Sequence, residues 1–229
     1  MTPKLLQKIS LKNSEGYLFL KIKIIMMENM MDYEIAKIDM KAPVFQMPYY
    51  DPNTDDEGVL HLDDMKGKWV ILFYYPADFT FVCPTELKDM ANVKARFDAM
   101  NVEVLAASTD TVFSHRAWTK HEMLMKDFPY KMLSDHNLSV ADQYNILDET
   151  TGIAGRGTFI IDPDGIIRGI EVTSGPLGRN SEELLRKIEA LQFMSSNPGV
   201  ACPARWSTGQ KTLTPNIKIA GQVGEELEK

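Results

Sequence analysis

The sequence predicts an α/β fold in which helices flank a central mixed β-sheet. An apolar run over residues 69–75 indicates a buried strand, and a helix-like segment over 84–100 follows it. A second apolar run, over 102–107, repeats this strand-helix rhythm. Further along, the turn sequence DPDG at 162–165 separates two apolar segments, which predicts an antiparallel hairpin. Alternating strands and helices favour α/β layers with parallel pairs, and the hairpin makes the sheet mixed.

The remaining elements follow from periodicity and from end signals. The segment 84–100 carries apolar residues at helical spacing, which gives it one buried face. A final helix is expected to begin near Asn180 or Ser181, because either side chain can cap it. Its apolar face is formed by Leu184, Leu185, Ile188 and Leu191. The other expected elements are a helix over 114–125, a short strand over 130–133, a short helix over 139–144 and hairpin strands over 158–161 and 166–172.

The composition is that of a globular protein with an acidic surface. The chain has 229 residues, of which 44% are hydrophobic and 25% charged, and its formal net charge is -7. This charge argues against binding to nucleic acid or to an anionic membrane, because both need clustered Lys and Arg. No segment reaches the length of about 18 apolar residues that a membrane helix needs. We therefore expect a cytoplasmic protein with neither nucleic acid nor membrane as a partner.

Three parts of the chain differ in character. Residues 1–36 are expected to form an N-terminal extension that is poorly ordered, although the alternation over 18–24 also allows an extra strand. Residues 37–200 are expected to form the main domain. Residues 201–229 are expected to form a C-terminal arm beyond the last helix.

Cys83 lies where a predicted strand gives way to a predicted helix. Pro84 suits the first helical position, because its missing N–H costs nothing there. Cys83 is therefore expected at the N-cap or in the first turn, where free backbone donors and the helix dipole favour an anion. The thiolate, which is the reactive form of cysteine, is favoured at such a place.

Two neighbours of Cys83 suit a reaction with a peroxide. A thiolate that attacks one peroxide oxygen needs hydrogen bonding to help the other oxygen leave. The Thr80 hydroxyl both donates and accepts, so it can orient a peroxide beside the sulfur. Pro76 can shield the sulfur from bulk water. The alternative is an inert buried cysteine, and the placement of Cys83 among these residues argues against it.

Glu86 opposes a thiolate, because it puts a carboxylate only three residues away. A cation is needed in compensation, and Arg156 and Arg179 are the candidates, since each follows a glycine in a loop-like setting. Glu86 can then hold an arginine fork in place. For either arginine taken alone, a solvated surface charge is the default interpretation, and position in the sequence does not overturn it.

The other polar groups do not indicate a metal or a cofactor. His115 and His121 are too far apart in sequence to share a helix face as an i, i+4 pair would. The two cysteines lie in neither a CxxC nor a close-spaced metal pattern, and two cysteines cannot form a disulfide scaffold of the secreted kind. We expect no cofactor and no metal.

Two motifs resemble those of a known family. The string FYYPADFTFVCPTE at 73–86 contains Pro76, Thr80 and Cys83 in the pattern PxxxTxxC, and GVACPARW at 199–206 contains Cys202. They resemble the motifs of typical two-cysteine peroxiredoxins of the alkyl hydroperoxide reductase C type. The resemblance extends from about residue 37 to residue 221.

This resemblance implies a thioredoxin-like fold and a thiol-dependent peroxidase. The expected substrates are hydrogen peroxide and organic hydroperoxides, and the expected roles are antioxidant defence and redox homeostasis. The implied site residues are Cys83 as the peroxidatic cysteine, Cys202 as the resolving cysteine, Pro76, Thr80 and Arg156 as the pocket, and Glu86 and Arg179 as its support.

The resemblance also implies partners. Oxidation would convert Cys83 to a sulfenic acid, and Cys202 of a partner subunit would attack it to form an intersubunit disulfide. This cycle requires a homodimer, and rings of five dimers are common in the family. The implied reductant is either a flavin disulfide reductase or a thioredoxin-like protein.

Two other functions stay open on the sequence. A general thiol-disulfide oxidoreductase would usually keep both cysteines in a CxxC, whereas Glu86 stands three residues after Cys83. A holdase chaperone needs exposed apolar patches, which a sequence does not reveal.

Overall fold

The computed structural model describes residue 21 and residues 35–228. The described residues from Ala36 onward belong to one compact unit. The expected alternation over 18–24 and the interpretation of residues 1–36 as a loose extension lie almost wholly outside the described residues. The expected boundaries at residues 37 and 201 stay predictions.

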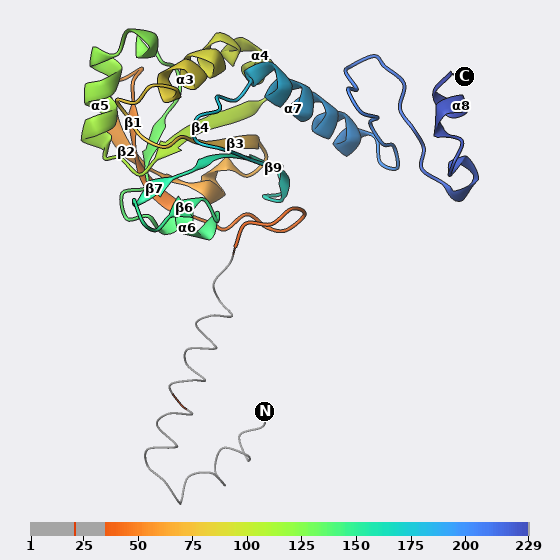
Figure 1. Cartoon of the computed structure of the whole chain (residues 1–229), viewed down its shortest axis with the longest axis horizontal. Coiled ribbons are helices and arrows are strands. Elements are labelled where there is room, and N and C mark those ends of the chain that lie inside the picture. The colour runs from red at the N-terminus through yellow and green to blue at the C-terminus, as the bar shows by residue number, and fades with distance from the viewer. Residues whose placement is uncertain (1–20, 22–34, 229) are drawn as a thin grey trace, which may run out of the picture. The chain divides into compact units, whose positions relative to one another are not determined.

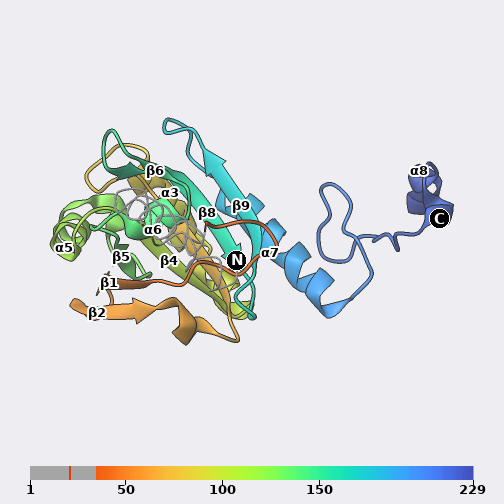
Figure 2. The same cartoon turned by 90° about the horizontal axis from the view of Figure 1, so that it is seen from below.

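A mixed seven-stranded sheet forms the centre of the unit (Figures 1 and 2). Its strands run in the order β2 (Asp56–His61), β1 (Gln46–Asp51), β5 (Met132–Ser134), β4 (Val102–Ser108), β3 (Trp69–Tyr74), β8 (Arg156–Ile161) and β9 (Ile167–Thr173). β4 pairs in parallel with β3 and β5, whereas β8 is antiparallel to β3 and β9, and β1 is antiparallel to β2 and β5. The predicted mixed sheet is confirmed. A separate two-stranded sheet pairs β6 (Leu147–Asp148) with β7 (Ile153–Ala154).

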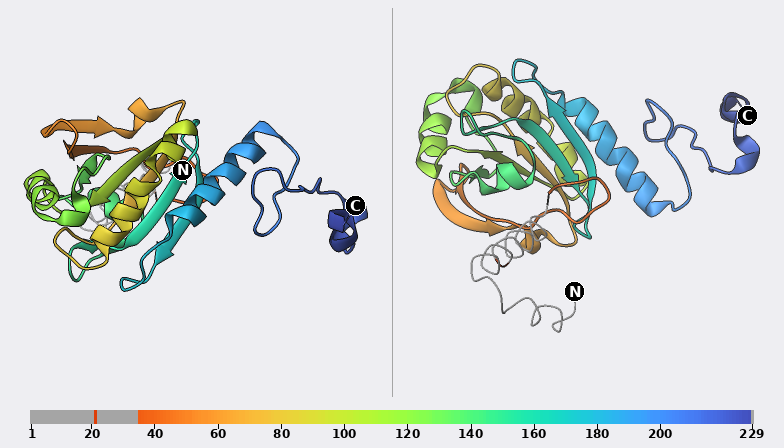
Figure 3. Two further views of the ribbon diagram at one scale, coloured as in Figure 1. Left: turned by 90° about the horizontal axis from the view of Figure 1, so that it is seen from above. Right: turned by 60° about the horizontal axis from the view of Figure 1, so that its bottom comes forward.

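Helices cover both faces of the sheet, as predicted (Figure 3). One face is packed mainly against α3, α4, α5 and α7, and the other against α6 and the segment 36–45. Side chains of β3 alternate between the two cores, so that Ile71 and Phe73 face one and Leu72 and Tyr74 face the other. The helices are α3 (Cys83–Asn92), α4 (Lys94–Ala99), α5 (Val112–His121), α6 (Ser139–Gln143), α7 (Ser181–Ser196) and α8 (Val223–Glu228), with short 3-10 turns η1 (Leu62–Met65), η2 (Met123–Met125) and η3 (Ile217–Ile219).

The elements with the strongest sequence signals are confirmed. The apolar runs form β3 and β4, and the segments on either side of the DPDG turn form the β8–β9 hairpin. Asn180 caps α7, because its side-chain oxygen accepts a hydrogen bond from the Glu182 N–H at 2.9 Å. Leu184, Leu185 and Ile188 of α7 are buried, as the predicted apolar face requires.

The single helix predicted over 84–100 is wrong. The chain forms two helices, α3 and α4, which meet at Val93, whose φ of −103° and ψ of 8° are not helical. A β-branched side chain is stiff in a helix and lowers its stability, so Val93 is a weak point. Met90, Val93 and Phe97 are nevertheless all buried, so the apolar stripe continues across the break.

Several elements differ from the prediction. The hairpin of β1 and β2 has no clear signal in the sequence, because Pro48 interrupts the first strand and β2 begins with acidic residues. The helix predicted over 114–125 begins two residues earlier, at Val112, and ends at His121 before the separate turn η2. Among the described helices, none is long and apolar enough to cross a membrane.

Candidate active site

Cys83 is the first residue of α3, directly after the loop 75–82 that follows β3. The predicted place in the first helical turn is therefore correct, although Pro84 occupies the second helical position rather than the first. The N–H groups of Thr85 and Glu86 donate to the carbonyl of Val82 at 3.0 and 3.2 Å and close this first turn. The side chain of Cys83 is 0% exposed. The helix thus begins with a buried sulfur at its positive end.

Arg156 reaches Cys83 from the first position of β8. Its Nη1 lies 3.3 Å from the Cys83 Sγ and also donates to Glu86 Oε2 at 2.6 Å. Its Nε donates to the carbonyl of Gly175 at 2.6 Å, which fixes the guanidinium from the opposite side. A negative charge on the sulfur is stabilised by this contact, because the charges are close together and shielded from water.

Arg179 holds the other side of the same carboxylate. Its backbone N–H and its Nε both donate to Glu86 Oε1 at 2.8 Å, and its Nη1 donates to Thr158 Oγ1 at 3.0 Å. The guanidinium stacks over the Phe73 ring at 3.4 Å from the centroid. Burial lowers the pKa of Arg179 below its ordinary value, and the hydrogen bonds to Glu86 act in the opposite direction.

Two buried cations and one buried carboxylate form one group beside Cys83. The side chains of Arg156 and Arg179 are 5% and 4% exposed, and that of Glu86 is 1% exposed. Buried charges are costly unless they are paired. A negative charge on Cys83 would place one more partner beside Arg156 Nη1, at 3.3 Å. Glu86 contacts both arginines, and its role in orienting them around the sulfur stays a prediction.

Thr80 and Pro76 lie in the same loop, and both are half-buried. The Thr80 hydroxyl donates to the carbonyl of Ala77 at 2.7 Å. Because its proton is used in this bond, the Thr80 oxygen is left to accept a hydrogen bond from a substrate. Among the described residues, the structure records no hydrogen bond between Thr80 and Cys83.

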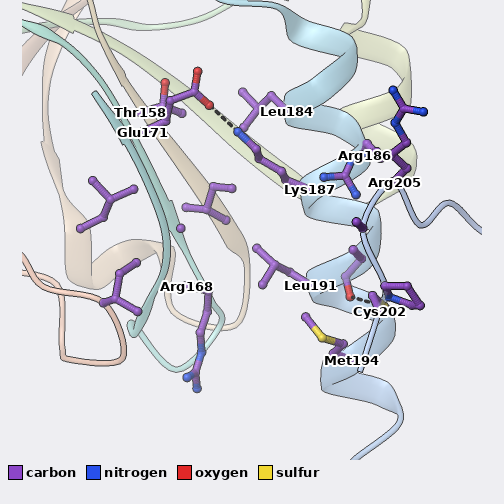
Figure 4. A pocket seen from close by; sticks show the side chains of 17 residues that line it. Thr158, Arg168, Glu171, Leu184, Arg186, Lys187, Leu191, Met194, Cys202 and Arg205 are labelled. Atoms are coloured by element: carbon purple, nitrogen blue, oxygen red, sulfur yellow. Dashed lines mark hydrogen bonds and ion pairs between the residues drawn. The ribbon is translucent and has the colours of Figure 1, made fainter. Parts of the chain in front are cut away.

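Cys202 lies on the segment after α7 and is half-buried. It lines a pocket of about 500 Å³ between α7 and the β8–β9 hairpin, where Figure 4 shows it beside Met194 and Leu191. Burial raises the pKa of the Cys202 thiol, and the charge of Arg186 acts against this rise. Both cysteines are free thiols. The structure therefore gathers Cys83 with Glu86 and the two arginines and leaves Cys202 outside this group.

Packing holds the segment around Cys202 against α7. Trp206 is buried and its ring lies 4.8 Å from that of Phe193. Its carbonyl accepts a hydrogen bond from Arg186 Nη1 at 3.1 Å, and an antiparallel bridge pairs Ala201 with Leu213. These contacts give the arm a defined starting point on α7.

Comparison with known proteins decides the family. A family model described as AhpC/TSA family matches residues 38–170. The chain is 41% identical over 189 residues to alkyl hydroperoxide reductase C of Staphylococcus aureus, which covers 82% of this chain and 100% of that relative. The chain belongs to the AhpC/TSA family. The resemblance to peroxiredoxins of the AhpC type is thereby confirmed, and the chain is a peroxide-reducing oxidoreductase.

Solved structures agree with the AhpC/TSA assignment. The reduced 2-Cys peroxiredoxin of Plasmodium vivax superposes with a TM-score of 0.77 at 31% identity and covers 82% of this chain and 98% of that one. AhpC of Enterococcus faecalis gives a TM-score of 0.70 at 38% identity and covers 74% of this chain and 100% of that one. The predicted thioredoxin-like α/β fold is confirmed.

Some residues of this AhpC/TSA site were missed by sequence reasoning. Phe73 stacks under Arg179, and Thr158 and the carbonyl of Gly175 orient the two guanidinium groups. Gly175 lies in a loop and Phe73 belongs to an apolar run, so neither carries a signal of its own.

The described residues contain no group of side chains that could hold a metal ion.

Proposed function

We propose that Cys83 is the peroxidatic residue of this thiol-dependent peroxidase and that Cys202 of a partner subunit resolves its oxidised form. The proposed substrates are hydrogen peroxide and organic hydroperoxides, and the proposed roles are antioxidant defence and redox homeostasis. The observation that carries the proposal is the distance of 3.3 Å between Arg156 Nη1 and the buried Cys83 Sγ. The curated relatives that share the family are named for alkyl hydroperoxide reduction.

In the proposed first step, the Cys83 thiolate attacks the terminal oxygen of a hydroperoxide ROOH. The S–O bond forms as the O–O bond breaks, so the sulfur is oxidised to a sulfenic acid and the peroxide is reduced. The leaving RO⁻ takes up one proton and departs as ROH. The Thr80 oxygen accepts the hydrogen bond of the peroxide O–H, and Arg156 donates to the oxygen that gains charge. Pro76 limits the access of water.

In the proposed second step, the Cys202 sulfur attacks the sulfenic sulfur of Cys83, an S–S bond forms and water leaves. A disulfide needs the two sulfurs about 2.05 Å apart. Since Cys83 is 0% exposed, the first turn of α3 and the preceding loop must open before a second sulfur can reach it. A reductant of the flavin disulfide reductase or thioredoxin-like class then supplies two electrons and two protons and restores both thiols.

A homodimer and a ring of five dimers are proposed as the assembly. β9 is an edge strand of the sheet, with Ile170 37% and Val172 56% exposed, so a second copy can pair along it. Several large apolar side chains near α5 and the Cys83 loop also lie on the surface of the isolated chain, which suits burial between dimers. They are Phe79, Phe81, Phe113 and Met123. A cytoplasmic location is part of the same proposal.

Trapping of the sulfenic acid tests the proposed function. In a Cys202→Ser variant, one equivalent of hydrogen peroxide should convert Cys83 to a sulfenic acid that dimedone labels, and mass spectrometry should place the label on Cys83. The reason is that the oxidised sulfur then has no second thiol to condense with. Alkyl hydroperoxides serve as the second substrate class. A chain that consumes peroxide without a label on Cys83 would exclude the proposed role.

A further inference from the structure

A buried polar cluster joins the loop 75–82 to α5, and the proposed chemistry does not use it. The side chains of Asp78 and His115 are both 0% exposed, and Asp78 Oδ2 lies 2.9 Å from His115 Nδ1. The Tyr75 hydroxyl donates to Asp78 Oδ1 at 2.8 Å. These three residues, called the loop anchor below, connect the loop to α5.

His115 is within hydrogen-bond distance of a partner at each of its two ring nitrogens. His115 Nε2 lies 3.2 Å from the carbonyl of Leu133, which can only accept, so this nitrogen donates. Nδ1 lies 2.9 Å from Asp78 Oδ2, within hydrogen-bond distance. Burial raises the pKa of Tyr75 well above its ordinary value, so its hydroxyl stays a neutral donor to Asp78. Hydrogen bonds through Asp78 thus join Tyr75 and His115 in the buried interior.

The backbone of the loop is attached at the same place. The N–H of Asp78 donates to Asp110 Oδ2 at 2.8 Å, and this oxygen also accepts from Ser108 Oγ at 2.7 Å. Ser108 ends β4 and Asp110 stands just before α5. The side chain of Asp78 thus contacts His115 of α5, and its main chain is hydrogen-bonded to Asp110 just before α5. Neither partner belongs to α3.

The residue that follows the anchor is strained. Phe79 has a φ of 55°, a left-handed conformation that a non-glycine residue adopts only at a cost. The next residue is Thr80, whose hydroxyl bond to the carbonyl of Ala77 closes the turn. If Asp78 loses its contacts, the strained backbone at Phe79 can relax to a more favourable conformation. Thr80 and Cys83 would then shift with the turn.

We propose that the loop anchor controls how Cys83 divides its time between a closed form that reacts with peroxide and an open form that reaches Cys202. His115 is then a positioning residue, since it acts through Asp78 and touches neither sulfur nor substrate. This inference rests on the proposed function, because it concerns the two steps of that cycle. A closed loop favours the oxidation step and an open loop favours disulfide formation.

Two variants and one control test the loop anchor. Asp78→Asn keeps the shape of the side chain and removes its charge, and His115→Phe keeps a ring of similar size and removes both hydrogen bonds. Tyr144→Phe is the matched control, because it removes one buried hydrogen bond, to the carbonyl of Pro43 at 2.9 Å, in the core on the other face of the sheet. Stopped-flow fluorescence measures the oxidation of Cys83 and the formation of the disulfide as separate rates.

We expect opposite changes in the two rates. In both anchor variants the oxidation rate should fall about tenfold, because the reacting groups are displaced. The rate of disulfide formation should rise about threefold, because the open form is more populated. Tyr144→Phe should change neither the oxidation rate nor the rate of disulfide formation. A general loss of stability would slow both steps together, and that result, or no change in either rate, would overturn the proposal.

Hydrogen exchange separates the anchor from the chemistry. Backbone amides of residues 77–83 should exchange faster in both anchor variants than in the parent chain and in Tyr144→Phe, and this readout needs no peroxide. Unchanged exchange in Asp78→Asn and His115→Phe would refute the anchor even if the enzyme reduces peroxides normally. Faster exchange in a chain whose parent does not oxidise Cys83 would instead refute the proposed function on which the inference rests.

Discussion

Replacement of the peroxidatic sulfur is expected to abolish peroxide reduction. In Cys83→Ser, the consumption of hydrogen peroxide with dithiothreitol as reductant should fall to the rate measured without protein. A serine hydroxyl is not ionised at neutral pH and cannot become a sulfenic acid, so neither step of the proposed cycle remains. The side chain is only slightly smaller, and the fold should be kept.

The control for this variant is Cys202→Ser. It should retain a single rapid oxidation per chain and lose only the disulfide. Substantial peroxide consumption by Cys83→Ser would contradict the assignment and would move attention to Cys202. Cys83→Ser also separates a peroxidase from a holdase chaperone. Suppression of the aggregation of an unfolded client does not require the Cys83 sulfur.

Loss of the cation beside the sulfur is expected to have the next largest effect. In an Arg156→Gln variant made in the Cys202→Ser background, the second-order rate of Cys83 oxidation should fall by about 10² to 10³. Arg156 Nη1 is the donor at 3.3 Å from Sγ, and its removal takes away the charge that stabilises both the thiolate and the leaving oxygen. The oxidation rate of Arg156→Lys should lie between that of Arg156→Gln and that of the chain with Arg156. Lysine keeps the charge but loses the guanidinium fork that also contacts Glu86.

Arg96→Gln is the matched control for the arginine substitution. Arg96 also forms an ion pair with a glutamate, Glu182, at 2.7 Å, but both side chains are more than half exposed. Its replacement should leave the oxidation rate unchanged, because exposed ion pairs contribute little. Equal rates for Arg156→Gln and the parent chain would show that Arg156 does not act on the sulfur.

Some parts of the site could be predicted because their signals are local. Pro76, Thr80 and Cys83 lie within the short segment 76–83, and the strand before it and the helix after it have clear sequence signals. Arg156 and Arg179 are distant in sequence, and their position alone left them as ordinary surface charges. The family resemblance assigned them to the site, and the structure brings both onto Glu86.

Other parts could not be predicted because they depend on tertiary contacts. His115 appears in the sequence as a lone histidine on a helix, and only the fold places it against Asp78. The β1–β2 hairpin has weak strand signals and is formed through pairing with β5. The break at Val93 leaves the apolar stripe intact, so periodicity could not reveal it. In each case the decisive interaction joins residues that are far apart in the chain or is silent in the pattern.

The central claim is that a buried Cys83 reacts with peroxide and is then resolved by Cys202 of another subunit. The most direct measurement is non-reducing electrophoresis of the peroxide-treated protein, followed by mass spectrometry of the linked peptides. The expected product is a covalent dimer in which Cys83 of one chain is joined to Cys202 of the other. A disulfide within a single chain, or oxidation that leaves both cysteines unlinked, would contradict it.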